Sequence, residues 1–292
     1  MTSLPKITVV TPSYNQGRFL EQTILSVLGQ LYGNLEYIVI DGGSTDESVE
    51  ILRRYESQLS YWISEKDSGQ AEALNKGFAR ATGEILCWLN SDDFLLPGAL
   101  QTAVRHLAAG ADLIYGDCLS FAEVGKRSIV NRPPPHHREH LAIVDYIVQP
   151  STFWRRSLWD KAGKLNESYH YAFDWEWFLR AESLGRFAKA DFIFSAYRFH
   201  EAHKSSHGGQ KRAQEIVAVA HSQGGEDAAR HYEFALAHVA ALKKFENIAL
   251  RLKGRGIKRH LPMARWAVPA LWNLPAGLDF QKLRQCAEML KL

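Results

Sequence analysis

The amino-acid sequence predicts an α/β protein with a Rossmann-like, mainly parallel sheet flanked by helices, followed by a helical C-terminal extension. Apolar runs typical of buried strands occur at 6–11, 35–41 and 84–89. Segments with helical spacing separate these runs, and such alternation is typical of a parallel sheet covered on both faces. The C-terminal part of the chain shows only helical periodicity.

The first strand, KITVVT at 6–11, ends at Pro12 and a polar turn. A helix is expected across 19–31 because apolar residues recur there at helical spacing. The run LEYIVID at 35–41 is the second strand, and Asp46 is placed to cap the next helix. The elements that follow are a strand at 61–64, a helix at 70–81, a strand at 84–89, a helix from Pro97 to His106 and a strand at 112–117.

The pattern loosens between 118 and 140, where RPPPHH at 132–137 predicts a stiff, exposed connection. The later elements are a helix at 138–147, a strand at 151–154, helices at 157–162 and 174–184, and a strand at 192–199. We therefore expect an α/β domain at 1–210 and a helical region at 211–292.

Composition limits the classes of protein that this sequence can encode. Of the 292 residues, 46% are hydrophobic and 23% are charged, which excludes wholesale disorder. The three cysteines form no even framework, which favours a reducing compartment. Since the chain shows neither a secretory signal pattern nor an uninterrupted apolar stretch of about 18 residues, we expect a cytoplasmic protein.

Basic charge is concentrated near the C-terminus. Between Lys243 and Arg265 the chain has eight Lys/Arg residues and a single acid, Glu246. A basic patch confined to one end argues against a nucleic-acid partner. Lys and Arg mixed with Trp and Leu across 243–272 are typical of a helix on an anionic leaflet, which suggests peripheral contact with the cytoplasmic face of the inner membrane. The alternative, that this segment packs on the protein with its charges solvated, stays open.

Polar residues gather where the three strongest strands end. In an open parallel sheet, ligands bind outside the carboxyl ends of the strands. The residues there are, strand by strand, Thr11, Pro12, Ser13, Tyr14 and Asn15, then Asp41, Gly42 and Gly43, then Asn90, Ser91, Asp92 and Asp93. No cysteine nucleophile, lysine-bearing phosphate loop or G-x-G-x-x-G turn occurs among them, so we exclude the usual ATP- and dinucleotide-binding classes.

The stretch N-S-D-D at 90–93 has two interpretations. Its oxygen ligands at the end of a buried strand suit Mg²⁺ or Mn²⁺ bound together with substrate phosphates. It can equally be an Asx-turn in which Asp93 caps the next helix. Residue chemistry alone does not decide between them.

A second acidic site lies in FDWEWFLR at 173–180. Asp174 and Glu176 begin a predicted helix, where carboxylates serve as an N-cap and as partners of the helix dipole. Their aromatic neighbours would also desolvate a carboxylate, as a general base requires.

Three histidines, His200, His203 and His207, are spaced by three and four residues. On a helix they could form a zinc-binding face. We favour a loop instead, because a strand pattern precedes them and a Gly-Gly pair follows, and we expect surface or packing roles for His203 and His207.

Together these residues resemble those of a known family, the family 2 glycosyltransferases with the GT-A fold. The resemblance spans about residues 5–207 and rests on motifs in family order: TVVTPSYNQGRFLEQTILSVLGQ, YIVIDGGSTDESVEIL, SEKDSGQAEALNKGFARATGEILCWLNSDD, QPSTFWRRSLWDKAG, FDWEWFLR and YRFHEAHKS. It implies inverting transfer of a sugar from a nucleotide-diphosphate donor, a UDP-sugar, to an acceptor hydroxyl. The implied setting is the synthesis of a cell-surface polysaccharide or a lipid-linked glycan.

The resemblance also implies roles for individual residues. Donor-binding residues would be Thr11, Pro12, Tyr14, Asp41, Asp67, Asn75, Asn90, Ser91 and Asp93, with Asp41 on the uracil ring. Asp174 corresponds to the catalytic aspartate that takes the proton of the acceptor hydroxyl. Residues on the acceptor side would be Gln149, Trp175 and Glu176. Asp92 and His200 would bind a divalent cation, Mn²⁺ or Mg²⁺, near the leaving diphosphate.

Three positions depart from the family pattern. The first Asp of the D-x-D element is Asn90, the Glu that usually precedes the catalytic Asp is Phe173, and an Arg that often clamps the diphosphate is Leu74. Asn90 and Phe173 motivate an alternative: a catalytically degenerate nucleotide-sugar-binding protein or a nucleotide-sugar hydrolase. A nucleotidyltransferase is less favoured, because the first strand lacks the Gly-rich, basic loop that wraps a triphosphate.

Overall fold

The computed structural model of the chain describes residues 4–123, 128–201, 203–204, 208–254, 268–271 and 274–290. The chain divides into two compact units, one made of Met1–Arg138 with Tyr146–His203 and the other of Glu139–Asp145 with Lys204–Leu292. The sequence pattern did not indicate that the short segment Glu139–Asp145 belongs with the C-terminal helices.

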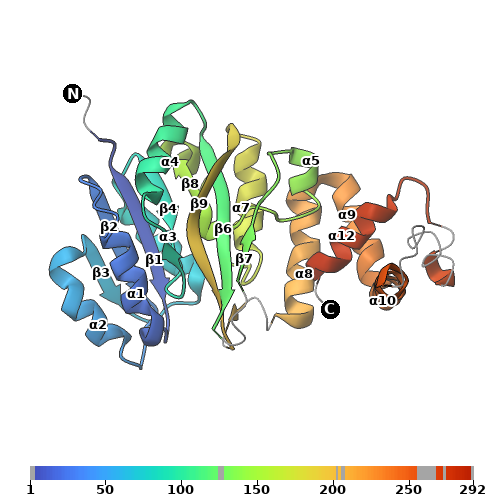
Figure 1. Ribbon diagram of the computed structural model, residues 1–292, viewed down its shortest axis with the longest axis horizontal. Helices are drawn as coiled ribbons and strands as arrows, with labels where there is room; N and C mark the ends of the chain where they lie inside the picture. Colours follow the sequence, from blue (N-terminus) through green and yellow to red (C-terminus); the bar gives the residue numbers. More distant parts are fainter. Residues whose placement is uncertain are drawn as a thin grey trace. The chain divides into compact units, whose positions relative to one another are not determined.

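The first unit is built on one sheet (Figure 1). Among the described residues its strands follow the order β3-β2-β1-β4-β8-β6-β9-β5, and β7 pairs with β6. The four N-terminal strands are mutually parallel and are β1 (Ile7–Ser13), β2 (Leu35–Asp41), β3 (Tyr61–Ser64) and β4 (Ile85–Trp88). This confirms the predicted α/β class and its parallel N-terminal half.

The other half of the sheet is mixed rather than parallel. Its strands are β5 (Phe94–Leu95), β6 (Leu113–Ala122), β7 (Ser128–Asn131), β8 (Thr152–Arg155) and β9 (Phe187–Phe199). Strand β8 runs antiparallel to both β4 and β6, whereas β9 is parallel to β6. The sequence analysis missed β7 and the start of β9, because Ser128 and Ile129 are exposed and the first half of β9 is only partly buried.

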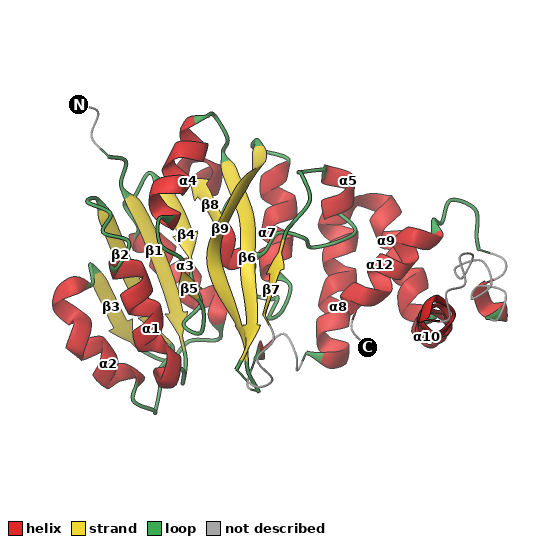
Figure 2. Ribbon diagram, in the orientation of Figure 1, coloured by secondary structure: helices red, strands yellow, loops and turns green. Residues whose placement is uncertain are grey.

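Helices flank this sheet, as Figure 2 shows. They are α1 (Gly17–Leu28), α2 (Ser48–Tyr55), α3 (Gln70–Arg80), α4 (Ala99–Ala108), α6 (Arg156–Ala162) and α7 (Phe173–Glu182), with 3₁₀ turns η1 (Glu56–Gln58) and η2 (Gln149–Ser151). Helix α3 packs so closely on β1 that a Cβ on Gly77 would lie 2.4 Å from a methyl carbon of Val10. The close approach brings the N-terminus of α3 to the carboxyl ends of the strands.

The predicted helix at 138–147 is wrong in extent, since α5 covers only Arg138–Leu141. Ile143 and Val144 both direct their backbone N–H groups to the carbonyl oxygen of His140, which closes a turn. Consecutive β-branched residues have low helix propensity, so the helix does not continue through them.

The core of the first unit is strongly aromatic. The indole of Trp88 packs against Trp154 with ring centroids 5.4 Å apart and stacks on Phe178 at 6.4 Å. Trp154 also contacts Trp177 at 5.0 Å. All four side chains are fully buried. Because Trp88 ends β4 and Phe178 lies on α7, this packing fixes α7 against the strand that leads into the 90–93 turn.

The second unit is helical in its described residues. Its elements are α8 (Gly209–Val219), the π-helical turn η4 (Ala220–Gly224), α9 (Gly225–Ala237), α10 (Val239–Gly254), η5 (Pro269–Leu271) and α12 (Phe280–Leu290). The buried ring of His231 accepts a hydrogen bond from the Asp279 N–H at 2.8 Å, which ties α9 to the start of α12. Tyr232 donates to the carbonyl oxygen of Ile143 at 2.6 Å and so holds the segment that precedes the first unit's η2.

Within the described ranges, no helix combines the length and the apolar character that crossing a bilayer requires. Much of the basic, apolar segment predicted at 243–272, including 255–267 and Trp272, lies outside the described residues. Its predicted membrane contact is therefore untested by the structure.

Candidate active site

The carboxyl ends of the parallel strands meet at one edge, with Asp41 in the middle. The sheet register pairs Asp41 with Ser13 of β1 on one side and with Ser64 of β3 on the other. Asp41 is fully buried, and its carboxylate accepts hydrogen bonds from the Ser64 hydroxyl at 2.6 Å and from the Ser44 hydroxyl and N–H at 2.5 and 2.8 Å. Asp41 therefore fixes the turn after β2 as well as standing at the predicted donor site.

The turns after β1 and β2 are joined to each other. The side-chain oxygen of Asn15 accepts a hydrogen bond from the Thr45 N–H at 2.8 Å. Asp46 accepts from the Gly17 N–H at 2.8 Å and from the Ser48 N–H at 3.0 Å, so one carboxylate binds the beginnings of both α1 and α2. Partial burial alone would raise the pKa of Asp46, but these hydrogen bonds outweigh it and hold the pKa below its usual range.

The predicted donor residues after β1 differ in their exposure. Thr11 is fully buried, with its hydroxyl 3.1 Å from the phenol oxygen of Tyr37, and Pro12 is buried beside it. Tyr14 is 62% exposed. Of these three, Tyr14 presents its side chain to solvent, and a donor contact of Thr11 or Pro12 stays a prediction.

Asn90 is the centre of a side-chain amide network. It accepts a hydrogen bond from the Gln70 amide at 2.7 Å and directs its own amide to the Gln149 oxygen at 3.3 Å and to an Asp93 oxygen at 3.4 Å. The Gln149 amide in turn donates to the carbonyl oxygen of Trp88 at 2.8 Å. This network joins α3, β4 and η2, and it uses Asn90 both as donor and as acceptor, which an ionised aspartate could not do.

The two carboxylates that follow Asn90 differ in their burial and in their contacts. Asp93 is 1% exposed, and one of its oxygens accepts a hydrogen bond from the Arg198 N–H at 3.0 Å. Burial, and then the charge of Asp92, raises the pKa of Asp93 well above its usual range. Ser91 is also buried, and its carbonyl oxygen accepts from the Thr23 hydroxyl at 2.9 Å. Asp93 and Ser91 thus build the turn, and their predicted donor contacts stay untested.

Asp92 meets the histidine predicted as its metal-binding partner. Its Oδ2 lies 3.0 Å from Nε2 of His200, although the two residues are 108 positions apart. The Asp92 side chain is 17% exposed and the His200 side chain 1%. The His200 ring packs on Phe19 with centroids 4.8 Å apart, and its other nitrogen has no hydrogen-bond partner in the described part of the chain.

The pair fits a divalent cation only if the substrate supplies further ligands. No group of three or more His, Cys, Asp or Glu side chains is placed to hold a metal ion within the described ranges. Mg²⁺ and similar ions are commonly held by one or two protein ligands together with substrate phosphates and water. A carboxylate oxygen and an imidazole nitrogen side by side agree with that kind of site.

Asp67 lies at the same edge, whereas Asn75 does not. Burial raises the pKa of Asp67 above its usual range. The hydrogen bond that its Oδ1 accepts from the Gly69 N–H at 2.9 Å lowers this pKa by less. Asn75 is buried, and its amide bonds to the backbone of Leu165 in both directions, at 3.0 Å each, and to Glu167 at 2.8 Å. In the structure Asn75 therefore holds the 165–167 segment.

The helix start that carries Asp174 lies beside the end of β4. The ring of Phe173 is 6.3 Å from that of Trp88, which stands two residues before Asn90. On the segment before α7, the ring of His170 lies beside Gly69, which is the residue before Gln70 of the amide network. Asp174 is partly exposed, and its Oδ1 accepts a hydrogen bond from the Trp175 N–H at 2.9 Å.

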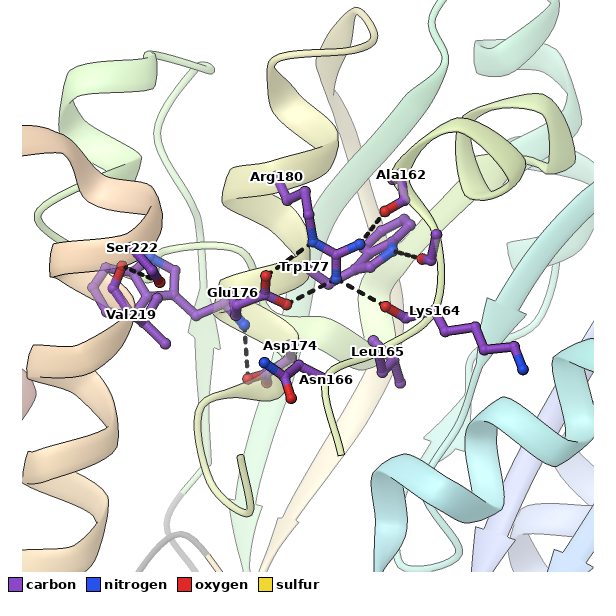
Figure 3. A network of polar contacts seen from close by, with 12 residues as sticks. Ala162, Lys164, Leu165, Asn166, Asp174, Glu176, Trp177, Arg180, Val219 and Ser222 are labelled. Carbon is purple, nitrogen blue, oxygen red and sulfur yellow. Dashed lines mark hydrogen bonds and ion pairs between the residues drawn. The ribbon is translucent and has the colours of Figure 1, made fainter. Parts of the chain in front are cut away.

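Trp175 and Glu176, predicted on the acceptor side, are both buried, and Figure 3 shows Glu176 pointing toward Arg180. Trp175 is 1% exposed and Glu176 is 4% exposed. Both Glu176 oxygens pair with the Arg180 guanidinium at 2.9 Å, and Arg180 also donates to the carbonyl oxygens of Ala162 and Lys164. The helical spacing of four residues makes this ion pair, which fastens α7 to the end of α6. Glu176 thus has a structural contact, and an acceptor-side role for Trp175 and Glu176 stays a prediction.

Sequence reasoning missed Arg198, whose backbone and side chain both contact the 92–93 turn. The motif YRFH contains it two residues before His200. The available signal was a charged residue within a largely apolar strand pattern, and it was not singled out.

Comparisons with known proteins agree with this geometry. A family profile described as Glycosyl transferase family 2 matches residues 8–175. An uncharacterized glycosyltransferase of Mycobacterium tuberculosis is 36% identical over 185 residues, which cover 62% of this chain and 70% of that protein. The GalNAc(5)-diNAcBac-PP-undecaprenol beta-1,3-glucosyltransferase of Campylobacter jejuni is 32% identical over 120 residues, which cover 40% of this chain and 39% of that one.

Two solved structures share the fold at low sequence identity. Staphylococcus aureus TarS 1-349 in complex with UDP-GlcNAc gives a TM-score of 0.64 at 16% identity, over 98% of this chain and 89% of that chain. The mannosyltransferase PcManGT of Pyrobaculum calidifontis, in complex with GDP-Man and Mn²⁺, gives a TM-score of 0.61 at 20% identity. The match covers 99% of this chain and 88% of that chain. These similarities confirm the predicted GT-A fold.

We expect Asn90→Asp to destabilise the protein, although it would complete the D-x-D pattern. The variant loses the donor to Gln149 and adds a negative charge beside the buried Asp93. Leaving a buried acceptor unpaired costs about 1–3 kcal/mol, so the midpoint of urea unfolding should fall. Asn166→Asp is the matched control, because exposed Asn166 uses its side-chain oxygen as the acceptor for Ser168. Equal or greater stability of Asn90→Asp than of the control would contradict the amide network.

Proposed function

Because the chain belongs to glycosyl transferase family 2 and is a glycosyltransferase, we propose that it transfers a sugar from a UDP-sugar to an acceptor hydroxyl with inversion of configuration. The observation that carries the proposal is the contact between Asp92 and His200. It joins the turn after β4 to the end of β9 at the edge where the parallel strands end. That edge is where α/β sheets bind their ligands.

The donor nucleotide is proposed to lie along the ends of β1, β2 and β3. Exposed Tyr14 offers an aromatic face there, and Asp41 and Asp46 hold the two turns beside it in place. Asp67 stands next to Gly42, where an added Cβ would lie 2.8 Å from its carboxylate. One structural neighbour was solved with UDP-GlcNAc and the other with GDP-Man, which supports a nucleotide-sugar donor. The choice of UDP rests on the resemblance at Asp41, and the sugar is left open.

A divalent cation, Mn²⁺ or Mg²⁺, is the proposed cofactor, with Asp92 and His200 as its protein ligands. When bound, such an ion offsets the negative charge that builds on the leaving diphosphate. Asp93 contributes by its position: because it is buried and bound to the Arg198 N–H, it holds the turn that carries Asp92. Asn90 keeps that turn connected to α3 and η2.

Asp174 is proposed as the general base. Its partial exposure at the start of α7 leaves a carboxylate near the aromatic core yet accessible to an acceptor. It would accept the proton of the acceptor hydroxyl while that oxygen attacks the anomeric carbon and the nucleoside diphosphate leaves. Inversion needs only this one catalytic carboxylate, unlike the pair in glycoside hydrolases.

The acceptor is proposed to be a cell-surface polysaccharide or a lipid-linked glycan. Support comes from the Campylobacter jejuni relative, whose name specifies a glycan on an undecaprenol diphosphate. Gln149, which lies in the amide network beside Asn90, is the residue proposed to stand nearest the transferred sugar.

We expect Asp174→Asn to abolish sugar transfer while the donor affinity stays within a few-fold of the wild type. The amide cannot accept the acceptor proton, but it conserves the shape of the side chain. Release of UDP in the presence of a glycan acceptor reports turnover, and calorimetric titration with the UDP-sugar reports donor binding. Asp160→Asn, on the exposed face of α6, is the control. Near-normal turnover of Asp174→Asn would rule out the base assignment.

We further propose that the catalytic domain is 1–210 and that 211–292 is a separate helical region whose 243–272 segment contacts the membrane peripherally, at its cytoplasmic face. The segment's eight Lys/Arg residues up to Arg265 support attraction to anionic lipid.

In a liposome flotation assay we expect the protein to float with vesicles that contain anionic lipid and to stay at the bottom with neutral ones. Raising the salt concentration should release it, because charge attraction over a Debye length is screened. Replacing Lys243, Lys244 and Arg251 with Gln should weaken flotation. No flotation with anionic vesicles at low salt would refute the membrane contact.

A further inference from the structure

Arg198 is a buried cation directly behind the turn that carries Asp92 and Asp93. It lies on β9 and is 8% exposed. Its guanidinium sits over the rings of Phe19 at 4.6 Å and Phe121 at 4.9 Å. A desolvated cation between aromatic faces is held firmly in position.

Arg198 contacts both acidic residues of the turn. Its backbone N–H donates to an Asp93 carboxylate oxygen at 3.0 Å, and its side-chain Nε donates to the carbonyl oxygen of Asp92 at 3.0 Å. The two bonds fix consecutive residues of the turn from one side. The Asp92 side chain, which contacts His200, extends from the backbone that Arg198 holds in this way.

The far end of the guanidinium is anchored on other elements. One terminal nitrogen donates to the Gln22 side-chain oxygen on α1, and the other lies 3.8 Å from Glu123, which pairs with Arg18 at 3.1 Å. Arg198 thereby connects β9, α1 and the end of β6 to one turn. Its positive charge also partly offsets the negative charges of Asp92 and Asp93.

A lysine could not make the same set of contacts. The planar guanidinium directs several N–H groups along fixed directions, whereas an ammonium is a single point charge on a flexible stem. At this position one group reaches the Asp92 carbonyl oxygen while another reaches Gln22.

On the basis of the proposed function, we propose that Arg198 is a positioning residue for the cation and diphosphate site. It holds the 90–93 turn so that Asp92 and His200 stand together. It acts through Asp92 and Asp93 rather than by touching the substrate. Partners that orient metal ligands typically change metal affinity or activity by 10–100-fold when they are replaced.

The test compares Arg198→Lys with Arg155→Lys. Arg155 on β8 is the matched control, because its guanidinium, like that of Arg198, donates to two oxygen atoms. These are the backbone carbonyl oxygens of Ala111 at 3.0 Å and Leu107 at 2.7 Å, and neither belongs to the site. Mn²⁺ binding in the presence of UDP is followed by the loss of the free-ion EPR signal. Thermal unfolding and the KM and kcat for the UDP-sugar are measured on the same samples.

We expect Arg198→Lys to bind Mn²⁺ about 10–100-fold more weakly than the wild type, with a raised donor KM. The two variants should lower the melting temperature by similar amounts, but Arg155→Lys should leave Mn²⁺ binding unchanged. Equal Mn²⁺ affinity in the two variants would overturn the inference. Absence of Mn²⁺ binding and of transfer in the wild type would instead refute the proposed function on which it rests.

If Arg198→Lys does not fold, Gln22→Ala decides the question. Gln22 is exposed on α1, so its loss leaves the fold intact and removes only the outer anchor of the guanidinium. A several-fold loss of Mn²⁺ affinity in that variant supports the positioning role, and an unchanged affinity contradicts it.

Discussion

The burial of the Asp93 carboxylate is the constraint around which the site is arranged. A carboxylate with 1% exposure is costly unless hydrogen bonds and a nearby cation offset the loss of water. The Arg198 N–H and guanidinium and the amide of Asn90 provide both. The preceding residue, Asp92, contacts His200 and has 17% of its side chain exposed. A further negative charge at position 90 would add repulsion without a partner.

This arrangement divides the polar edge into parts with different tasks. Asp41 and Asp46 hold the turns after β1 and β2, where the donor nucleotide is proposed to lie. The Asn90 network joins the end of β4 to α3 and η2. The aromatic contact between Trp88 and Phe173 then brings the start of α7, with Asp174, to the end of β4. The 90–93 turn, the residue after β9 and the start of α7 thus carry the proposed catalytic groups, and hydrogen bonds and packed rings hold them in place.

The sequence predicted the four parallel strands and the polar residues that follow them, because β1, β2 and β4 are largely buried apolar runs and β3 is a shorter, partly buried one. The motif resemblance placed Asp92 with His200, and the structure brings them together across 108 positions. Side-chain contacts could not be predicted: Asp92 and Asp93 are adjacent and chemically alike, and long-range contacts with His200 and Arg198 distinguish them. The burial of Glu176 could not be predicted for the same reason, since it depends on the ion pair with Arg180 and on the end of α6.

The most direct measurement is a thermal-shift panel of UDP-, GDP- and dTDP-sugars, each with and without Mn²⁺. A ligand at 100 times its Kd stabilises the folded state by about 2.7 kcal/mol, which is enough to move the melting temperature visibly. The account predicts a shift with a UDP-sugar that grows when Mn²⁺ is present and that is lost in Asp92→Asn. An equal shift without the metal, or none with any of the donors, would contradict the assignment of this edge as a cation-dependent nucleotide-sugar site.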